Sequence, residues 1–111
     1  MSGIVMASHL QIPVPRDRME AYCRRHQIRK LSFFGSVLRD TFHAHSDIDV
    51  LVEFEPEAHG GLLDLCRMQT ELGSILGRNV DFVDRAALEN SRNYIRRQAV
   101  LATAQTFYAA R

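Results

Sequence analysis

The order of predicted elements indicates an α/β (α+β) fold, a small three-stranded sheet flanked by about four helices. Two observations predict it. Stretches in which apolar residues recur at helical spacing alternate with short apolar runs along the sequence. The length of 111 residues, of which 46% are hydrophobic and 24% charged, is typical of one soluble domain that builds a core without disulfides or structural metal. We therefore expect a single domain over residues 1–111, with residues 1–14 as a flexible N-terminal segment.

A first helix and a first strand are predicted after Pro15. Apolar residues recur at helical spacing over residues 16–27, which predicts the helix. Residues 31–34 form a short apolar and aromatic run that ends at Gly35. Such a run is typical of a buried strand that stops at a tight turn.

A short helix and the clearest strand come next. Ser36 can cap a helix that continues to about residue 40. Residues 47–54 have the sequence DIDVLVEF, in which apolar side chains occupy every second position. This alternation predicts a strand with one buried face.

The second half of the chain predicts a helix, a strand and a final helix. The apolar stripe of residues 62–76 ends at Gly77, a typical C-terminal cap. Residues 80–83 predict a short strand. Residues 86–111 favour helix over most of their length, although residues 99–103 are also compatible with a strand.

Charge and cysteine content narrow the class of protein. The formal net charge is +1, so no overall basic field indicates a nucleic-acid coat or a membrane-surface binder. Cys23 and Cys66 have no paired spacing, which is typical of buried thiols in a reducing compartment. No stretch approaches the roughly 20 apolar residues of a transmembrane helix. We expect a cytoplasmic protein with no membrane association and no direct nucleic-acid binding.

Two aspartates on the predicted strand 47–54 are candidate metal ligands. Asp47 and Asp49 are one residue apart, so their carboxylates leave the same face of the strand roughly 6 to 7 Å apart. Hard oxygen ligands in this arrangement suit Mg²⁺. Taken alone, the pair is more typical of two exposed acids at a strand end than of a metal site.

A glycine and a serine precede this pair at a fixed spacing. Gly35 and Ser36 follow an apolar strand and precede a predicted helix, where backbone N–H groups can cradle a phosphate. Arg39, about one helical turn later, can reach the same phosphate. The alternative is that Gly35 forms an ordinary turn, Ser36 an ordinary cap and Arg39 a surface charge. Ten residues separate Ser36 from Asp47, and the combination is much rarer by chance than either part.

Asp81 is the third candidate carboxylate. It interrupts the apolar strand 80–83, where a half-buried acid needs a partner. If this strand lies beside strand 47–54, Asp81 joins the other two acids. The alternative is a strand-edge acid paired with an arginine such as Arg78. Asp84 is the nearest competitor, but it follows the predicted strand and has the opposite parity.

These residues resemble the signature of the polymerase-β-like nucleotidyltransferase superfamily. The segment GSVLRDTFHAHSDIDVLVEF contains G-S, ten residues and D-x-D. It resembles specifically the minimal nucleotidyltransferases, or MNT domains, called MntA-type antitoxins when paired with a HEPN toxin. The resemblance covers nearly the whole chain and implies their fold, with a small mixed sheet.

The resemblance also implies roles for individual residues. It places Gly35 and Ser36 on the nucleotide phosphates, and it makes three aspartates the catalytic metal ligands: Asp47, Asp49 and Asp81. Arg39 matches the arginine that often follows the G-S pair, whereas Asp40 stands where many relatives have glycine.

The activity implied is transfer of AMP from ATP, with two Mg²⁺ ions, to a tyrosine of a HEPN ribonuclease toxin. The toxin would be encoded by the adjacent gene and form a hetero-oligomer with this protein. One alternative is a non-catalytic antitoxin that neutralises its partner by binding. Another is a small-molecule nucleotidyltransferase of the aminoglycoside type, whose relatives usually carry an additional helical domain that we do not expect here.

Overall fold

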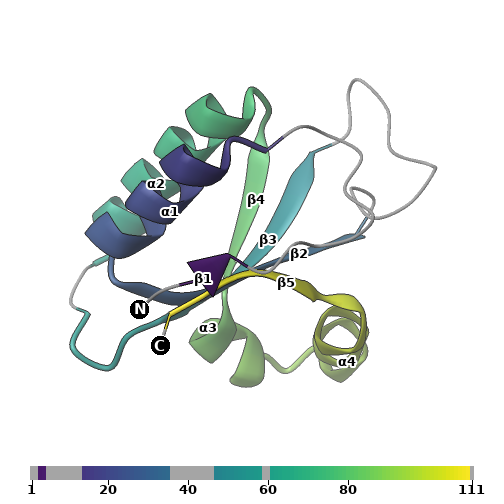
Figure 1. Cartoon of the computed structure of the whole chain (residues 1–111). Coiled ribbons are helices and arrows are strands. Elements are labelled where there is room, and N and C mark those ends of the chain that lie inside the picture. The colour runs from purple at the N-terminus through teal and green to yellow at the C-terminus, as the bar shows by residue number, and fades with distance from the viewer. Residues whose placement is uncertain (1–2, 5–13, 36–46, 59–60, 111) are drawn as a thin grey trace.

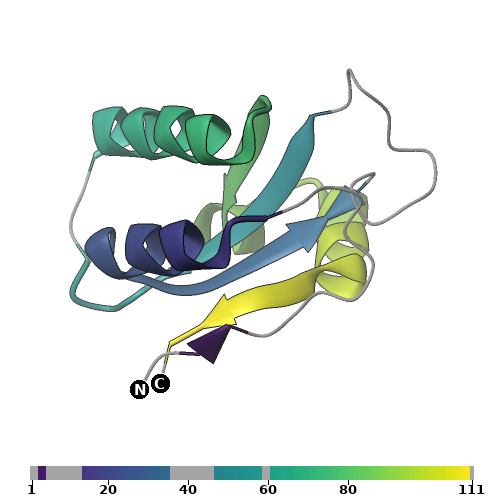
Figure 2. The same ribbon diagram turned by 45° about the horizontal axis from the view of Figure 1, so that its top comes forward.

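The computed structural model describes residues 3–4, 14–35, 47–58 and 61–110. Its strands are β1 (Gly3–Ile4), β2 (Ile28–Phe34), β3 (Ile48–Phe54), β4 (Val80–Asp84) and β5 (Gln105–Ala109). Its helices are α1 (Arg16–Arg25), α2 (Leu62–Leu76), α3 (Arg85–Glu89) and α4 (Tyr94–Thr103). The strands form one sheet in the order β1-β5-β2-β3-β4. α1 and α2 cover one face of this sheet, and α3 and α4 lie against the other (Figures 1 and 2).

The sheet is mixed because its neighbours pair in both directions. β2 runs antiparallel to both β3 and β5, whereas β3 and β4 are parallel. α2 connects the two parallel strands, as a crossover connection requires. The prediction of a small mixed α+β fold is therefore confirmed.

The larger hydrophobic core lies between the sheet and helices α1 and α2. Alternate residues of β3 point into it, and Ile48, Val50 and Val52 are fully buried there. The intervening Leu51 points to the opposite face and packs in a smaller cluster with Val100 of α4. This second face therefore carries Asp49, which has the same parity as Leu51.

The sheet has two more strands than the three predicted. The two-residue β1 pairs with β5, so Gly3–Ile4, within the segment expected to be flexible, is part of the sheet. Residues 5–13 lie outside the described residues. The first predicted strand, 31–34, begins earlier, at Ile28, because the chain pairs with Phe54 from that point.

The helix predicted over most of residues 86–111 is correct only in part. Two helices and a strand occupy this segment, and residues 99–103 belong to α4. α4 starts where the Asn93 side chain accepts a hydrogen bond from the backbone N–H of Arg96. β5 then forms because its backbone pairs with both β1 and β2 while Phe107 packs edge-to-face on Phe33.

Other predictions had mixed outcomes. α2 does end at Gly77, which has φ +70° in the left-handed region. Cys23 is buried as expected, but Cys66 is exposed on α2, and both are free thiols.

The short helix predicted from Ser36 lies outside the described residues. No described helix is long and apolar enough to cross a membrane.

One buried hydrogen bond joins the two helices above the main core. The hydroxyl of Tyr22 on α1 donates to the carbonyl oxygen of Met68 on α2 at 2.8 Å. We expect Tyr22→Phe to lower the free energy of unfolding by about 1 kcal/mol, because the carbonyl loses a partner that water does not replace. Urea denaturation measures this. Tyr94→Phe, at a half-exposed position, is the control and should change nothing; equal losses in both variants would contradict the prediction.

Candidate active site

The parallel pairing of β3 with β4 brings two of the candidate aspartates together. Asp49 and Asp81 are direct register partners, and neighbouring strands are about 4.8 Å apart. Both side chains leave the sheet on the face that carries α3 and α4, as their parity with Leu51 and Val83 requires. β4 is an edge strand, so Asp81 is about half exposed. Asp47 directly precedes β3 and is exposed.

Burial and repulsion from the neighbouring carboxylates both change the protonation of Asp49. Burial, the largest cause, and the charges of Asp81 and Asp47 together raise the pKa of this carboxyl to about 6. A hydrogen bond between the carboxyl groups of Asp49 and Asp81 also raises this pKa, because such a bond needs a proton on one of them. The cluster therefore favours a positive ion or a proton.

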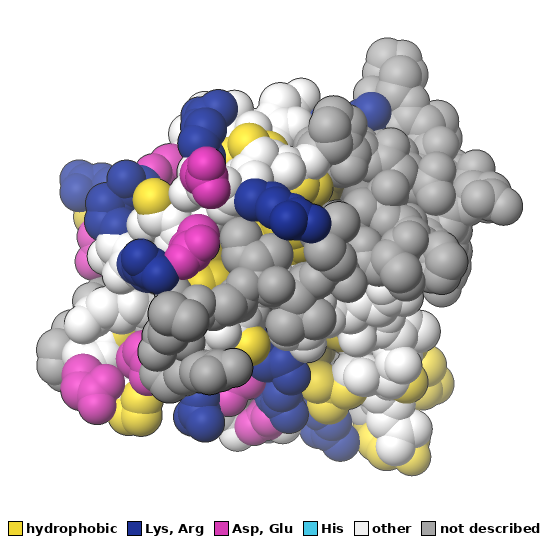
Figure 3. Space-filling model, viewed as in Figure 1, with side chains coloured by type: hydrophobic (Ala, Val, Ile, Leu, Met, Phe, Trp, Pro, Cys, Tyr) yellow, Lys and Arg dark blue, Asp and Glu magenta, His cyan; other side chains and the backbone are white. Residues whose placement is uncertain are grey.

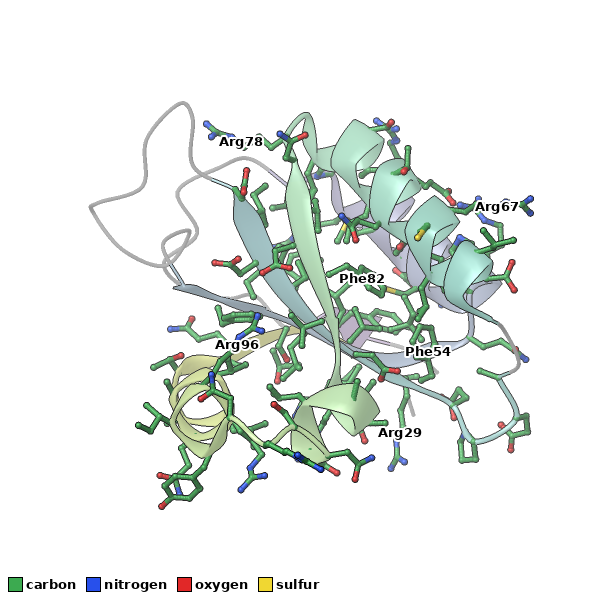
Figure 4. The ribbon with its side chains drawn as sticks, turned by 180° about the vertical axis from the view of Figure 1, so that it is seen from behind. Arg29, Phe54, Arg67, Arg78, Phe82 and Arg96 are labelled. Atoms are coloured by element: carbon green, nitrogen blue, oxygen red, sulfur yellow. The ribbon has the colours of Figure 1, made fainter. Side chains whose placement is uncertain are left out.

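Arg96 supplies part of that positive charge. It projects from α4 toward the sheet (Figure 4), and its Nη2 lies 3.6 Å from Asp81 Oδ2. Its charge lowers the pKa of Asp49 against the other effects. Sequence reasoning missed Arg96, because nothing in the expected helix 86–111 distinguished its arginines. The sequence alternative had named Arg78, which lines the same cavity as Asp81, whereas the ion pair at 3.6 Å is made by Arg96.

Gly35, at the end of β2, lies close against the Asp49 carboxylate. Its φ is +78°, and a Cβ added there would lie 2.2 Å from Asp49 Oδ2. The residue before it, Phe34, is the register partner of Asp49, so the end of β2 runs directly beside this carboxylate. Ser36 and Arg39, the other two candidate phosphate-binding residues, lie outside the described residues.

The competing acid Asp84 has a structural role. It is the last residue of β4 rather than a residue beyond it, and its Oδ1 accepts a hydrogen bond from the backbone N–H of Ala86 at 3.1 Å. This bond caps α3.

An open, mostly polar cavity of about 930 Å³ lies beside the carboxylates, at the N-terminal ends of β3 and β4. This volume lies within the range of small-molecule sites. Its walls are the three aspartates, the second half of α2 and the turn into β4: Asp47, Asp49, Asp81, Gln69, Thr70, Gly73, Ser74, Gly77, Arg78, Asn79 and Val80. Within the described ranges, no three His, Cys, Asp or Glu side chains are grouped closely enough to hold a metal ion by themselves.

Gly35→Ala should destabilise the protein for two reasons, the positive φ and the contact with Asp49. Gly77→Ala is a matched control, because Gly77 has φ +70° but an added Cβ meets nothing within 4 Å. We expect Gly35→Ala to lose about 1 kcal/mol more than Gly77→Ala, since its Cβ displaces the Asp49 carboxylate. Urea denaturation of both variants measures the difference. Equal losses would mean that the close approach of Gly35 to Asp49 has no energetic consequence.

The raised pKa of Asp49 predicts a pH-dependent stability. The folded protein keeps this proton up to about pH 6, whereas the unfolded carboxyl loses it near 3.8. Stability therefore falls as the pH rises through this window. Asp49→Asn should remove that loss and stabilise the protein near pH 7 by about 1 kcal/mol, after solvent screening of the half-buried carboxylate is allowed for. At about pH 4 the two proteins should be equally stable.

Chemical denaturation across this pH range, with a chelator present, tests the prediction. Glu57→Gln is the control, because Glu57 is exposed in the loop after β3. A stabilisation that is the same for both variants, or that does not grow with pH, would contradict the prediction that ionised Asp49 lowers the free energy of unfolding.

The chain matches the family model of the nucleotidyltransferase domain over residues 17–103. Over 57 residues it is 44% identical to a Methanocaldococcus jannaschii protein with the provisional name protein adenylyltransferase; the match covers 51% of this chain and 59% of that protein. The chain spans less than two thirds of the length of the curated relatives it matches.

Two solved structures share the fold. One, described provisionally as a minimal nucleotidyltransferase, is 35% identical with a TM-score of 0.60, and the match covers 81% of this chain and 89% of that chain. The other contains a tri-AMPylated HEPN toxin of Shewanella oneidensis in complex with an MNT antitoxin. At 20% identity and a TM-score of 0.57, over 85% of this chain and 69% of that chain, it shows the fold alone. Because the family model covers most of the sequence, the chain belongs to the nucleotidyltransferase domain family.

Proposed function

We propose that this protein is an ATP- and Mg²⁺-dependent protein adenylyltransferase and the MNT-type antitoxin of a HEPN toxin, which it silences by transferring AMP to a tyrosine. The observation that carries the proposal is the register of β3 and β4, which pairs Asp49 with Asp81 beside the backbone of Gly35. Family membership and the relative named a protein adenylyltransferase support the reaction class. Both cysteines are free thiols, which fits the cytoplasm.

The donor set of the site fits Mg²⁺. Its groups are carboxylate oxygens, and burial together with the negative charges of Asp81 and Asp47 raises the pKa of Asp49. Mg²⁺ is usually held by one or two carboxylates together with substrate phosphates and water, so a site that is incomplete without ATP is expected. Asp47, Asp49 and Asp81 would hold two ions, which supply neutralisation of charge on the attacking and leaving oxygens.

The chain's own groups would then orient ATP and the acceptor. The backbone of Gly35 and the hydroxyl of Ser36 hold the β- and γ-phosphates, with Arg39 on the same phosphates. The tyrosine oxygen attacks the α-phosphorus, the bond from that phosphorus to the bridging oxygen breaks, and pyrophosphate leaves. The phenolic proton passes to Asp81, the most exposed carboxylate of the β3–β4 pair.

A HEPN-type toxin encoded by the adjacent gene is the proposed partner. The shared fold with a chain from the complex of an MNT antitoxin and a tri-AMPylated HEPN toxin supports this choice. The two proteins would form a hetero-oligomer, since the acceptor tyrosine must reach carboxylates that lie at the edge of the sheet.

Intact mass of the neighbouring HEPN-type protein, after incubation with this protein, ATP and MgCl₂, tests the proposal. We expect mass gains in whole AMP units that a chelator abolishes. The double variant Asp47→Asn, Asp49→Asn should lower the rate at least about a hundredfold, because charge stabilisation of the transition state is lost. Asp17→Asn, an exposed aspartate in the first turn of α1, is the control and should keep full activity.

The alternatives give different results in the same experiment. A stable complex without any mass gain would replace the proposal by an antitoxin that acts through binding alone. No complex and no mass gain, with AMP transferred to an aminoglycoside instead, would indicate a small-molecule nucleotidyltransferase.

A further inference from the structure

The helix that supplies Arg96 also has an apolar face that the protein does not bury. Val100 is the buried residue of α4. On the side of the helix away from Val100, the exposed fractions are 56% for Tyr94, 78% for Ile95 and 38% for Leu101. At 100° per residue these three side chains fall within one arc and form an apolar stripe, which the exposed Gln98 interrupts. A helix that is apolar on both faces is typical of one that has a further partner.

The surroundings of this stripe are positively charged. Residues 90–111 contain four arginines and no aspartate or glutamate. Arg97 lies beside the stripe, with its guanidinium 5.6 Å from the centre of the Tyr94 ring. The nearest acid on α3, Glu89, pairs with Arg85. Figure 3 shows hydrophobic side chains next to Lys and Arg side chains at the lower right, where Figure 1 places α4. A complementary partner has an apolar patch with an acidic border.

The helix α4 carries the stripe on its outer side and contacts the carboxylate site on its inner side. Arg96 points inward to within 3.6 Å of Asp81, while Ile95 points outward on the same turn. The diameter of a helix with its side chains is about 10 to 12 Å, so a protein held on α4 lies within reach of the carboxylates. An acceptor protein must approach this region to place a hydroxyl beside Asp81.

We propose that the outward face of α4, formed by Tyr94, Ile95 and Leu101 and bordered by Arg92 and Arg97, is the surface on which the acceptor protein docks. The acceptor contributes an apolar patch edged by carboxylates. This inference rests on the proposed function, because it assigns the place where the partner of that reaction binds. Tyrosine and arginine, both present here, are among the residues that dominate the energy of protein interfaces.

The experiment compares two equally exposed positions. Ile95→Asp places a negative charge in the stripe, whereas Leu63→Asp does so on α2, where Leu63 is 74% exposed. α2 covers the opposite face of the sheet (Figure 1). Ile95 lies in the first turn of α4, so an aspartate there favours the helix dipole and should not unfold the helix. Thermal unfolding of both variants verifies that they are folded.

Binding to the neighbouring HEPN-type protein is measured by calorimetry without nucleotide, and AMP transfer is measured by mass. We expect Ile95→Asp to weaken binding at least about tenfold, and to raise KM for the acceptor while kcat changes little. Leu63→Asp should bind as the wild type does. Binding of a non-hydrolysable ATP analogue with Mg²⁺ should be the same in all three proteins.

The possible outcomes separate this inference from the proposed function. If the wild type binds the acceptor without transferring AMP to it, and Ile95→Asp loses this binding, the docking surface is supported and the enzymatic proposal is overturned. Unchanged binding in Ile95→Asp overturns the docking surface even if AMP is transferred, and so does failure of the wild type to bind the acceptor. A wild-type dimer that Ile95→Asp converts to a monomer, seen by sedimentation, would overturn it in favour of a second copy of this chain.

Discussion

The pairing of β3 with β4 is the constraint on which the candidate site depends. Parallel register sets Asp49 beside Asp81, and a slip of one residue would send one of the two carboxylates to the opposite face. The apolar faces of the same strands oppose such a slip, since Val50 and Val80 are buried beneath α1 and α2. Each buried aliphatic side chain contributes about 1.5 to 3 kcal/mol, so several of them outweigh the repulsion between two half-exposed carboxylates.

The site is therefore an electrostatically unfavourable arrangement that packing elsewhere maintains. The pKa of Asp49 stays raised because this carboxyl is half-buried and because the fold holds it beside Asp81, with Gly35 leaving no space on its other side. Arg96 relieves part of the repulsion from the exposed side. What remains is an attraction for cations, which a metal ion with the phosphates of a nucleotide can satisfy. The same property makes the free protein less stable near neutral pH than its core alone would allow.

The sequence predicted those parts of the fold whose pattern has one structural meaning. Alternation over residues 47–54 and the apolar run around Asp81 each require a strand, and both strands formed. β5 was not predictable in this way, because its residues follow a helix without a glycine or proline between them, and its strand conformation depends on pairing with β1 and β2. The position of Arg96 could not be predicted either, since it depends on how β5 orients α4.

β5 thereby connects the core to the partner surface that we propose. Phe107 and Tyr108 bury the strand in the main core, on the side away from α4. The chain that enters β5 at Gln105 therefore fixes where α4 ends, and Val100 fixes which side of the helix faces the sheet. Once that side is set, helical geometry leaves Arg96 near Asp81 and Ile95 on the outside. The short helix α4 thus places the Arg96 guanidinium beside Asp81 and an apolar stripe on its opposite side. Binding of an acceptor to the outer side of α4 is therefore linked, through the helix backbone, to the charge balance at Asp81.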